Sequence, residues 1–168
     1  MNLNSKRFPN IDYEPGSELF LAIGEAELPF FFDVEEELTL SEEAMRIVAD
    51  TLDEVNQLEM LAKHFVKESL SDEAHSAHAI TSYFMQFHRE ELDSESVSAL
   101  FPDCDPEELS FLEMVDFLRV NRFGSLVSSE SGEQEFIMDL NFDPEITDEL
   151  LVVYFDKERK VLEISHES

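Results

Sequence analysis

Apolar residues recur at intervals of three and four between residues 41 and 70, which is the spacing of one face of an α-helix. We therefore predict a long helix over this segment. Thr39 and Glu42 have the spacing of a capping box at its start. The predicted buried face consists of Ala44, Ile47, Val48, Leu52, Val55, Leu58, Leu61, Ala62 and Phe65.

Two further helices are predicted after a break near residues 69–72. The first runs to about Glu90. The second covers residues 105–120, with Asp105 as N-cap and Pro106 in the first helical position. Because apolar residues occupy most of its circumference, we expect this last helix to be central in the fold.

Strand patterns occur at both ends of the chain. Residues 19–34 predict a hairpin, since two apolar and aromatic runs flank the turn Gly24-Glu25-Ala26-Glu27. Pro29 indicates the start of a strand or a sheet edge. From Asn121 onward the pattern favours four more strands. They are expected over residues 123–129, 136–142, 150–155 and 161–165.

These elements predict an α+β fold in which an N-terminal β-hairpin and about three helices precede a C-terminal antiparallel four-strand meander packed against the helices. The 168 residues are 43% hydrophobic, which is enough for one sizeable core. We therefore expect a single domain over residues 1–168.

The charge is strongly unbalanced. Forty Asp and Glu residues face 11 Lys and Arg residues, so the formal net charge is −29. This balance argues against direct nucleic-acid binding and against anionic membrane surfaces, because both need clustered basic side chains. It favours a basic protein as partner, and it leaves the oligomeric state open.

The single cysteine, Cys104, allows no internal disulfide. The polar residues 1–10 have no apolar run typical of a signal peptide, and no stretch has the length of a transmembrane helix. We therefore expect a cytoplasmic protein.

No motif predicts catalysis, a cofactor or a metal. His75 and His78, and likewise His64 and Glu68, could share helix faces, but zinc needs three or four converging ligands. The series Asp139, Asn141 and Asp143 matches the start of a calcium loop, although Pro144 occupies its glycine position and Leu150 its final glutamate position. We interpret these residues as structural and predict that the protein is not an enzyme.

Acidic clusters are the best candidates for a partner-binding surface, because carboxylates attract Lys and Arg and speed association. A further acidic cluster comprises Glu90, Glu91, Asp93 and Glu95. The two candidate clusters comprise Asp33, Glu35, Glu36, Glu37 and Asp103, Asp105, Glu107, Glu108.

The segments 146–156 and 162–168 resemble the ending of an uncharacterised bacterial domain family of small, acidic, cytoplasmic proteins. The resemblance covers about the last 45 residues and implies no activity. In size and charge the chain is also loosely similar to immunity proteins that neutralise basic bacterial toxins, which is an analogy and not a motif match.

Four functions are compatible with the sequence. The first is a non-enzymatic, immunity-like inhibitor that docks a basic protein. The second is a nucleic-acid mimic that blocks a DNA-binding protein. The third is a small-ligand protein or enzyme with a pocket beside His64, Tyr83 and His88. The fourth is a cation or polyamine sink. The first of these functions accounts best for a core with regular apolar spacing beneath a strongly charged surface.

Overall fold

The computed structural model describes residues 1–25 and 27–168, and its centre is one mixed β-sheet. Six strands follow one another across this sheet in the order β1-β2-β3-β4-β5-β6. Their bounds are β1 Leu19–Glu25, β2 Leu28–Val34, β3 Arg119–Val127, β4 Gln134–Asn141, β5 Leu150–Asp156 and β6 Val161–Glu167.

The sheet joins the two strand-rich parts of the sequence. The predicted hairpin is confirmed as β1 and β2, and β3 to β6 form the predicted antiparallel meander. The sheet has six strands and not the four of the predicted meander, because β2 pairs in parallel with β3. The α+β class is confirmed. Of the predicted hairpin turn, Ala26 lies outside the described residues.

The predicted long helix is divided in two. A short helix α1 (Glu36–Thr39) precedes α2 (Glu42–Asp53) and α3 (Val55–Ser71), which are separated at Glu54. The capping box at Thr39 is wrong. The side chain of Ser41 accepts the Ala44 N–H and begins α2, because the Thr39 hydroxyl is already bonded within α1 and to the Gly16 N–H.

The remaining helical region differs more from the prediction. It contains α4 (His78–Gln86), the π-helix η1 (Phe87–Glu91), α5 (Ser94–Leu100) and α6 (Phe111–Val115). Over the described chain this makes six α-helices and one π-helix, where about three helices were predicted.

The helix predicted over 105–120 is wrong at both ends. Asp105 accepts the Glu107 N–H in an isolated turn and caps no helix. The helix α6 begins after Ser110, because Ser110 and Glu113 form a reciprocal capping box there. It ends at Val115, and β3 begins soon after, at Arg119.

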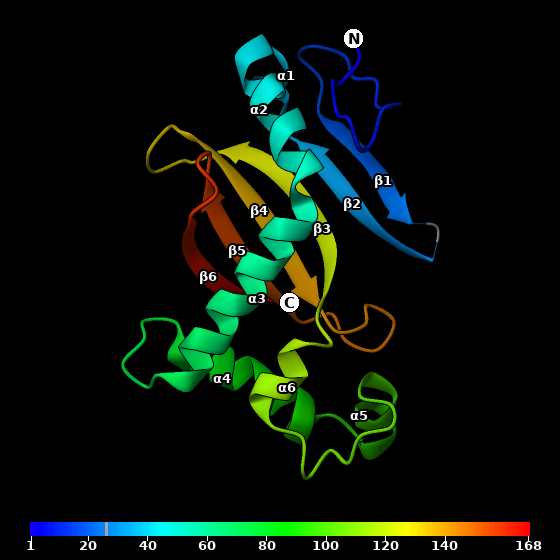
Figure 1. The fold of residues 1–168 in the computed structure, drawn as a ribbon, viewed down its shortest axis with the longest axis vertical. Helices are drawn as coiled ribbons and strands as arrows, with labels where there is room; N and C mark the ends of the chain where they lie inside the picture. The colour runs from blue at the N-terminus through cyan, green and yellow to red at the C-terminus, as the bar shows by residue number, and fades with distance from the viewer. Residues whose placement is uncertain (26) are drawn as a thin grey trace.

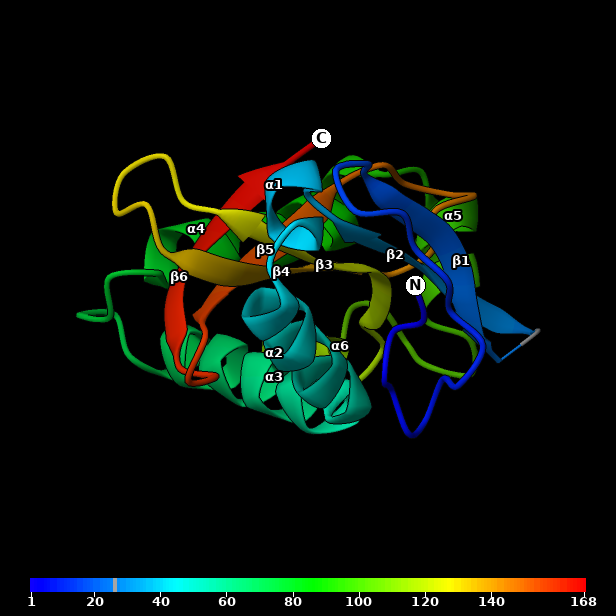
Figure 2. The ribbon, with the colours of Figure 1, turned by 90° about the horizontal axis from the view of Figure 1, so that it is seen from above.

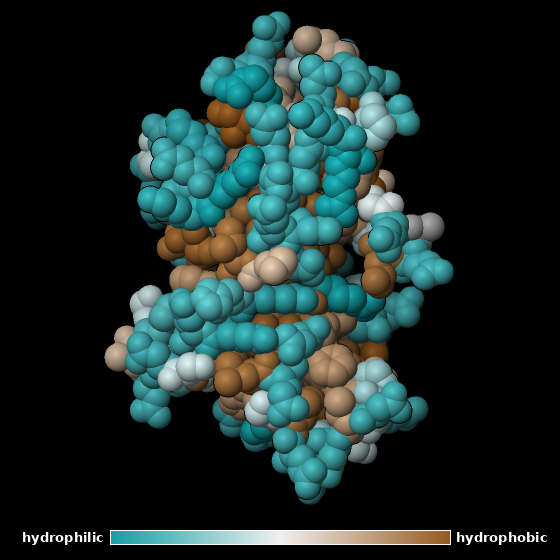
Figure 3. All heavy atoms as spheres, viewed as in Figure 1, coloured by the Kyte–Doolittle hydropathy of each residue, from teal (hydrophilic) through white to brown (hydrophobic). Residues whose placement is uncertain are grey.

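The helices α2 and α3 pack along one face of the sheet, while α4, α5 and α6 gather beyond one of its ends (Figures 1 and 2). The core lies between the sheet and these helices. Its largest fully buried side chains include Phe32, Phe84, Phe101, Phe123, Phe136 and Phe155. Seen from the side of α2 and α3, the surface is mainly hydrophilic, with apolar side chains visible between the elements (Figure 3).

In the described part of the chain, none of the helices combines the length and the apolar character needed to cross a membrane.

Candidate functional site

The clearest hollow in the structure forms where the sheet separates. The parallel pairing of β2 with β3 joins Phe31–Val34 to residues 122–125 and stops there. The residues before these in each strand, 28–30 and 119–121, have no partner across this boundary, and the pairing of β3 with β4 is irregular between Val120 and Arg122. The hairpin therefore diverges from β3 toward its tip (Figure 1).

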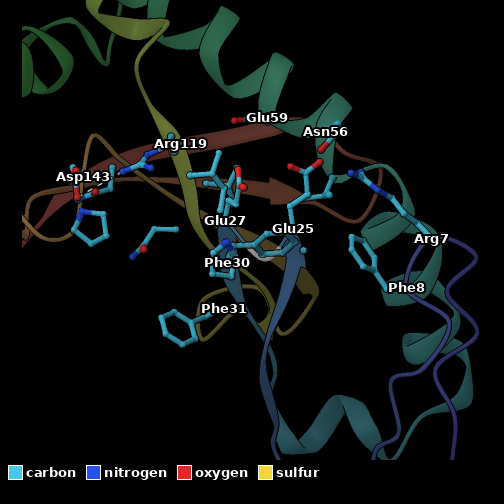
Figure 4. Close-up of a pocket in the computed structure, with 18 of the residues that line it drawn as sticks. Arg7, Phe8, Glu25, Glu27, Phe30, Phe31, Asn56, Glu59, Arg119 and Asp143 are labelled. Atoms are coloured by element: carbon cyan, nitrogen blue, oxygen red, sulfur yellow. Dashed lines mark ion pairs between the residues drawn. The ribbon is translucent and has the colours of Figure 1, made fainter. Parts of the chain in front are cut away.

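A cleft of about 630 Å³ occupies this gap. Both diverging strand segments line it, together with the first turns of α3 and part of the N-terminal segment. Figure 4 shows Arg7 and Phe8 at one end, Arg119 and Asp143 at the other, and side chains of the hairpin between them. The site thus combines segments that lie far apart in sequence.

The charged side chains of the lining are mostly acidic. The hairpin contributes Glu25 and Glu27, α3 contributes Glu59, and the loop after β4 contributes Asp143 and Glu145. Glu59 is 3.6 Å from Lys63 of the same helix, in an i,i+4 ion pair. Ion pairs at this spacing on a helix contribute only a few tenths of a kcal/mol, so Glu59 remains free to exchange partners.

Two arginines mark the ends of the cleft in different ways. The Arg119 Nε–H donates to the Phe142 carbonyl, and its Nη2 lies 3.7 Å from Asp143. This arginine therefore holds the loop after β4. The Arg7 guanidinium lies 5.2 Å from the ring centre of Phe8, in a cation–π contact.

The floor of the cleft is aromatic and aliphatic. Phe30 packs edge-on against Phe8, with ring centres 6.3 Å apart. Leu28 is 54% exposed at the rim. Phe31 also reaches the cleft and stacks on Phe20 at 5.5 Å, and both rings are substantially exposed. The cleft thus offers carboxylates around an apolar surface.

An ion pair anchors the hairpin where the strands meet. The Arg122 Nε–H and Nη2–H each donate to the Asp33 carboxylate, at 2.7 Å. Asp33 lies so close to β3 that a Cβ at position 124 would come within 2.6 Å of its Oδ1, which explains Gly124. Asp139 lies on the other side of Arg122, at 3.9 Å.

Two buried oxygens near this anchor have no partner among the described residues: Asp139 Oδ1 and Asn141 Oδ1. Burial raises the pKa of Asp139, and the nearby Arg122 charge opposes this effect. The Asn141 amide donates to the Thr147 and Glu149 carbonyls and so fixes the loop that borders the cleft.

The predicted acidic clusters are not brought together. Asp33 is only 9% exposed, and its carboxylate accepts a hydrogen bond from Arg122. Asp33 is therefore not part of an open docking surface, contrary to the prediction. Glu35 accepts the Val127 N–H, whereas Glu36 and Glu37 are exposed on α1. The second cluster, Asp103, Asp105, Glu107 and Glu108, follows α5 at the opposite end of the molecule (Figure 1).

The histidines lie elsewhere. His64 is exposed and pairs with Glu68, and Tyr83 is 59% exposed on α4. His88 is fully buried, its Nδ1 2.8 Å from the Phe84 carbonyl and its Nε2 3.0 Å from the Thr147 hydroxyl. The cleft is lined by none of the three residues predicted to border a pocket.

The structure also shows where the residues of the two candidate metal patterns lie. The His75 Nδ1 accepts the Ala77 N–H, and the His78 Nδ1 contacts the Ser69 carbonyl. Asp139 and Asn141 are buried in β4, while Asp143 follows the strand. Within residues 1–25 and 27–168, no three His, Cys, Asp or Glu side chains form a group that could hold a metal ion.

Sequence reasoning missed the residues of this cleft. Glu25, Glu27 and Leu28 surround the hairpin turn and were visible only as turn and strand signals. The available signal was an apolar residue, Leu28, directly after an acidic turn, and this pattern equally fits the start of a strand.

The chain has no significant match among known family models, curated proteins or solved structures.

Proposed function

We propose that this protein is a non-enzymatic binding protein that docks a basic segment of a partner protein in the cleft between β2 and β3. The observation that carries the proposal is the lining itself, in which five carboxylates surround an aromatic floor. Of the two arginines present, Arg119 is already engaged by Asp143 and the Phe142 carbonyl.

The net charge of −29 acts at longer range. It attracts basic partners and repels acidic ones, and it accelerates encounter more than it strengthens the final complex. Affinity must therefore come from the cleft, where apolar contacts with Phe30 and Leu28 add to the charge pairing. An inhibitor of a basic toxin is the most concrete form of this function.

The test is binding of labelled Arg- and Lys-rich peptides to the whole protein, measured by fluorescence anisotropy at two salt concentrations. Glu25→Gln/Glu59→Gln is expected to weaken binding by about tenfold or more, because it removes two carboxylates from the lining. Glu163→Gln/Glu167→Gln is the matched control, since it removes the same charge from β6 at the far edge of the sheet.

Equal weakening by both double variants would contradict the proposal and would assign binding to the overall charge.

The nucleic-acid mimic stays an alternative for the same site. Duplex DNA that displaces this protein from a captured DNA-binding partner would favour the mimic, because both would then occupy one basic surface.

A further inference from the structure

We propose that the bound segment adds to the sheet as an extended strand along the free edge of β3 at residues 119–121. This inference rests on the proposed function, because it specifies how the basic segment lies in the cleft. It states a mode of recognition in which main-chain hydrogen bonds supply affinity and side chains supply selectivity.

The first step concerns the backbone. Arg119 and Val120 pair with Asn141 and Leu140 of β4, so one side of this part of β3 is occupied. On its other side β2 joins only from Arg122 onward. A strand has hydrogen-bonding groups on both sides, so the edge between Arg119 and Asn121 faces the cleft without a strand partner.

The second step distinguishes the two edges of the cleft. β2 presents Leu28, Pro29 and Phe30 there. Proline has no N–H, so this edge lacks a donor in its middle. None of residues 119–121 is a proline, so those whose backbone groups point to the cleft keep both the N–H and the carbonyl. The edge of β3 is therefore the better template for an added strand.

The third step concerns the side chains. An added strand places alternate side chains on the two faces of the sheet. On the side of α3 lie the Phe8–Phe30 pair and, above it, Asn56 and Glu59 (Figure 4). A Lys or Arg side chain can lay its aliphatic stem over Phe30 and extend its charge to Glu59. The cleft thus selects basic residues at alternate positions.

The experiment uses capped hexapeptides with Arg or Lys at every second position and the full-length protein. The tightest binder is compared with two isomers, N-methylated on the odd or on the even backbone nitrogens. Alternate residues of a strand donate to opposite neighbours, so strand addition is blocked in only one isomer. That isomer is expected to bind at least about tenfold more weakly, while the other retains its affinity.

A second readout locates the contact. Hydrogen exchange followed by NMR should slow at one or more amides of residues 119–121 when the unmodified peptide is bound. If both isomers bind as tightly as the parent, strand addition is overturned while docking by charge survives. If no peptide of the set binds the protein, the proposed function fails together with this inference.

Discussion

Arg122 holds Asp33 through two parallel hydrogen bonds of 2.7 Å across the β2–β3 boundary, linking residues 89 positions apart in the chain. The pairing is bidentate, and the Asp33 side chain is only 12% exposed. This contact marks the point at which the hairpin joins the meander. Beyond it, toward the hairpin tip, the strands separate and the cleft begins.

We expect Asp33→Asn to lower the free energy of unfolding by about 2 kcal/mol, because the substitution leaves the half-buried Arg122 charge without its partner. Asp50→Asn is the matched control. Asp50 pairs with Arg46 at 3.5 Å with both side chains largely exposed, so its loss should cost less than about 0.5 kcal/mol. Urea denaturation of both variants measures the difference, and equal costs would show that the Asp33 pair is no anchor.

Gly124→Ala tests the close approach of β2 to β3. The added Cβ would meet Asp33 Oδ1 at 2.6 Å and the Asp33 carbonyl oxygen at 2.8 Å, so the backbone must shift. We expect a loss of about 2 kcal/mol in unfolding free energy. The shift should also speed hydrogen exchange in β2.

Gly132→Ala provides the comparison, because its φ is +71° and nothing lies within 4 Å of the added atom. It should cost about 1 kcal/mol through backbone strain alone. Unchanged exchange in β2 of the Gly124 variant would contradict the steric explanation.

His88 should make stability depend on pH. Burial lowers its pKa in the folded protein below the ordinary value of 6.5. As the pH falls through 6.5, the unfolded chain therefore binds a proton that the folded chain does not, and the folded state loses up to about 1.4 kcal/mol per pH unit. Above this range the neutral imidazole is present in both states and the penalty disappears.

The measurement compares the wild-type protein with His88→Gln between pH 7.5 and pH 5. The wild type should lose its stability advantage over the variant as the pH falls. A constant difference between wild type and His88→Gln over this range would refute the prediction.

Ser110→Ala should destabilise the protein by about 1 kcal/mol, because Ser110 Oγ accepts the Glu113 N–H at the start of α6. Asp105→Ala should cost less than about 0.5 kcal/mol, since the Asp105 side chain accepts only the exposed Glu107 N–H in a turn. Thermal unfolding of the two variants decides between the observed and the predicted helix start. A larger cost at Asp105 would reverse their roles.

The local parts of the fold were predictable. The alternation in β4 and the apolar spacing of α2 and α3 reflect which side chains face a core, and that information is present in neighbouring residues. The start of α6 was misplaced because Asp105-Pro106 has good capping chemistry, while Ser110 and Glu113 satisfy two backbone groups at once. Two competing caps of similar strength cannot be ranked without the tertiary structure.

The site was less predictable for a different reason. The cleft depends on the parallel pairing of Phe31–Val34 with β3, a contact between segments far apart in the chain. No local pattern encodes that pairing. Asp33 illustrates the problem, since its neighbours in sequence suggest an exposed acidic run, whereas Arg122 and Gly124 create the pocket that buries it.

The long interval between the hairpin and its partner strand also has a consequence for synthesis. At about 5–20 residues per second, β3 emerges several seconds or more after β2 has left the ribosome. During this time the aromatic segment Leu28–Val34 has an open edge suited to intermolecular aggregation. The segment is flanked by Glu27 on one side and Glu35–Glu37 on the other, and like charges beside an apolar strand generally oppose its aggregation.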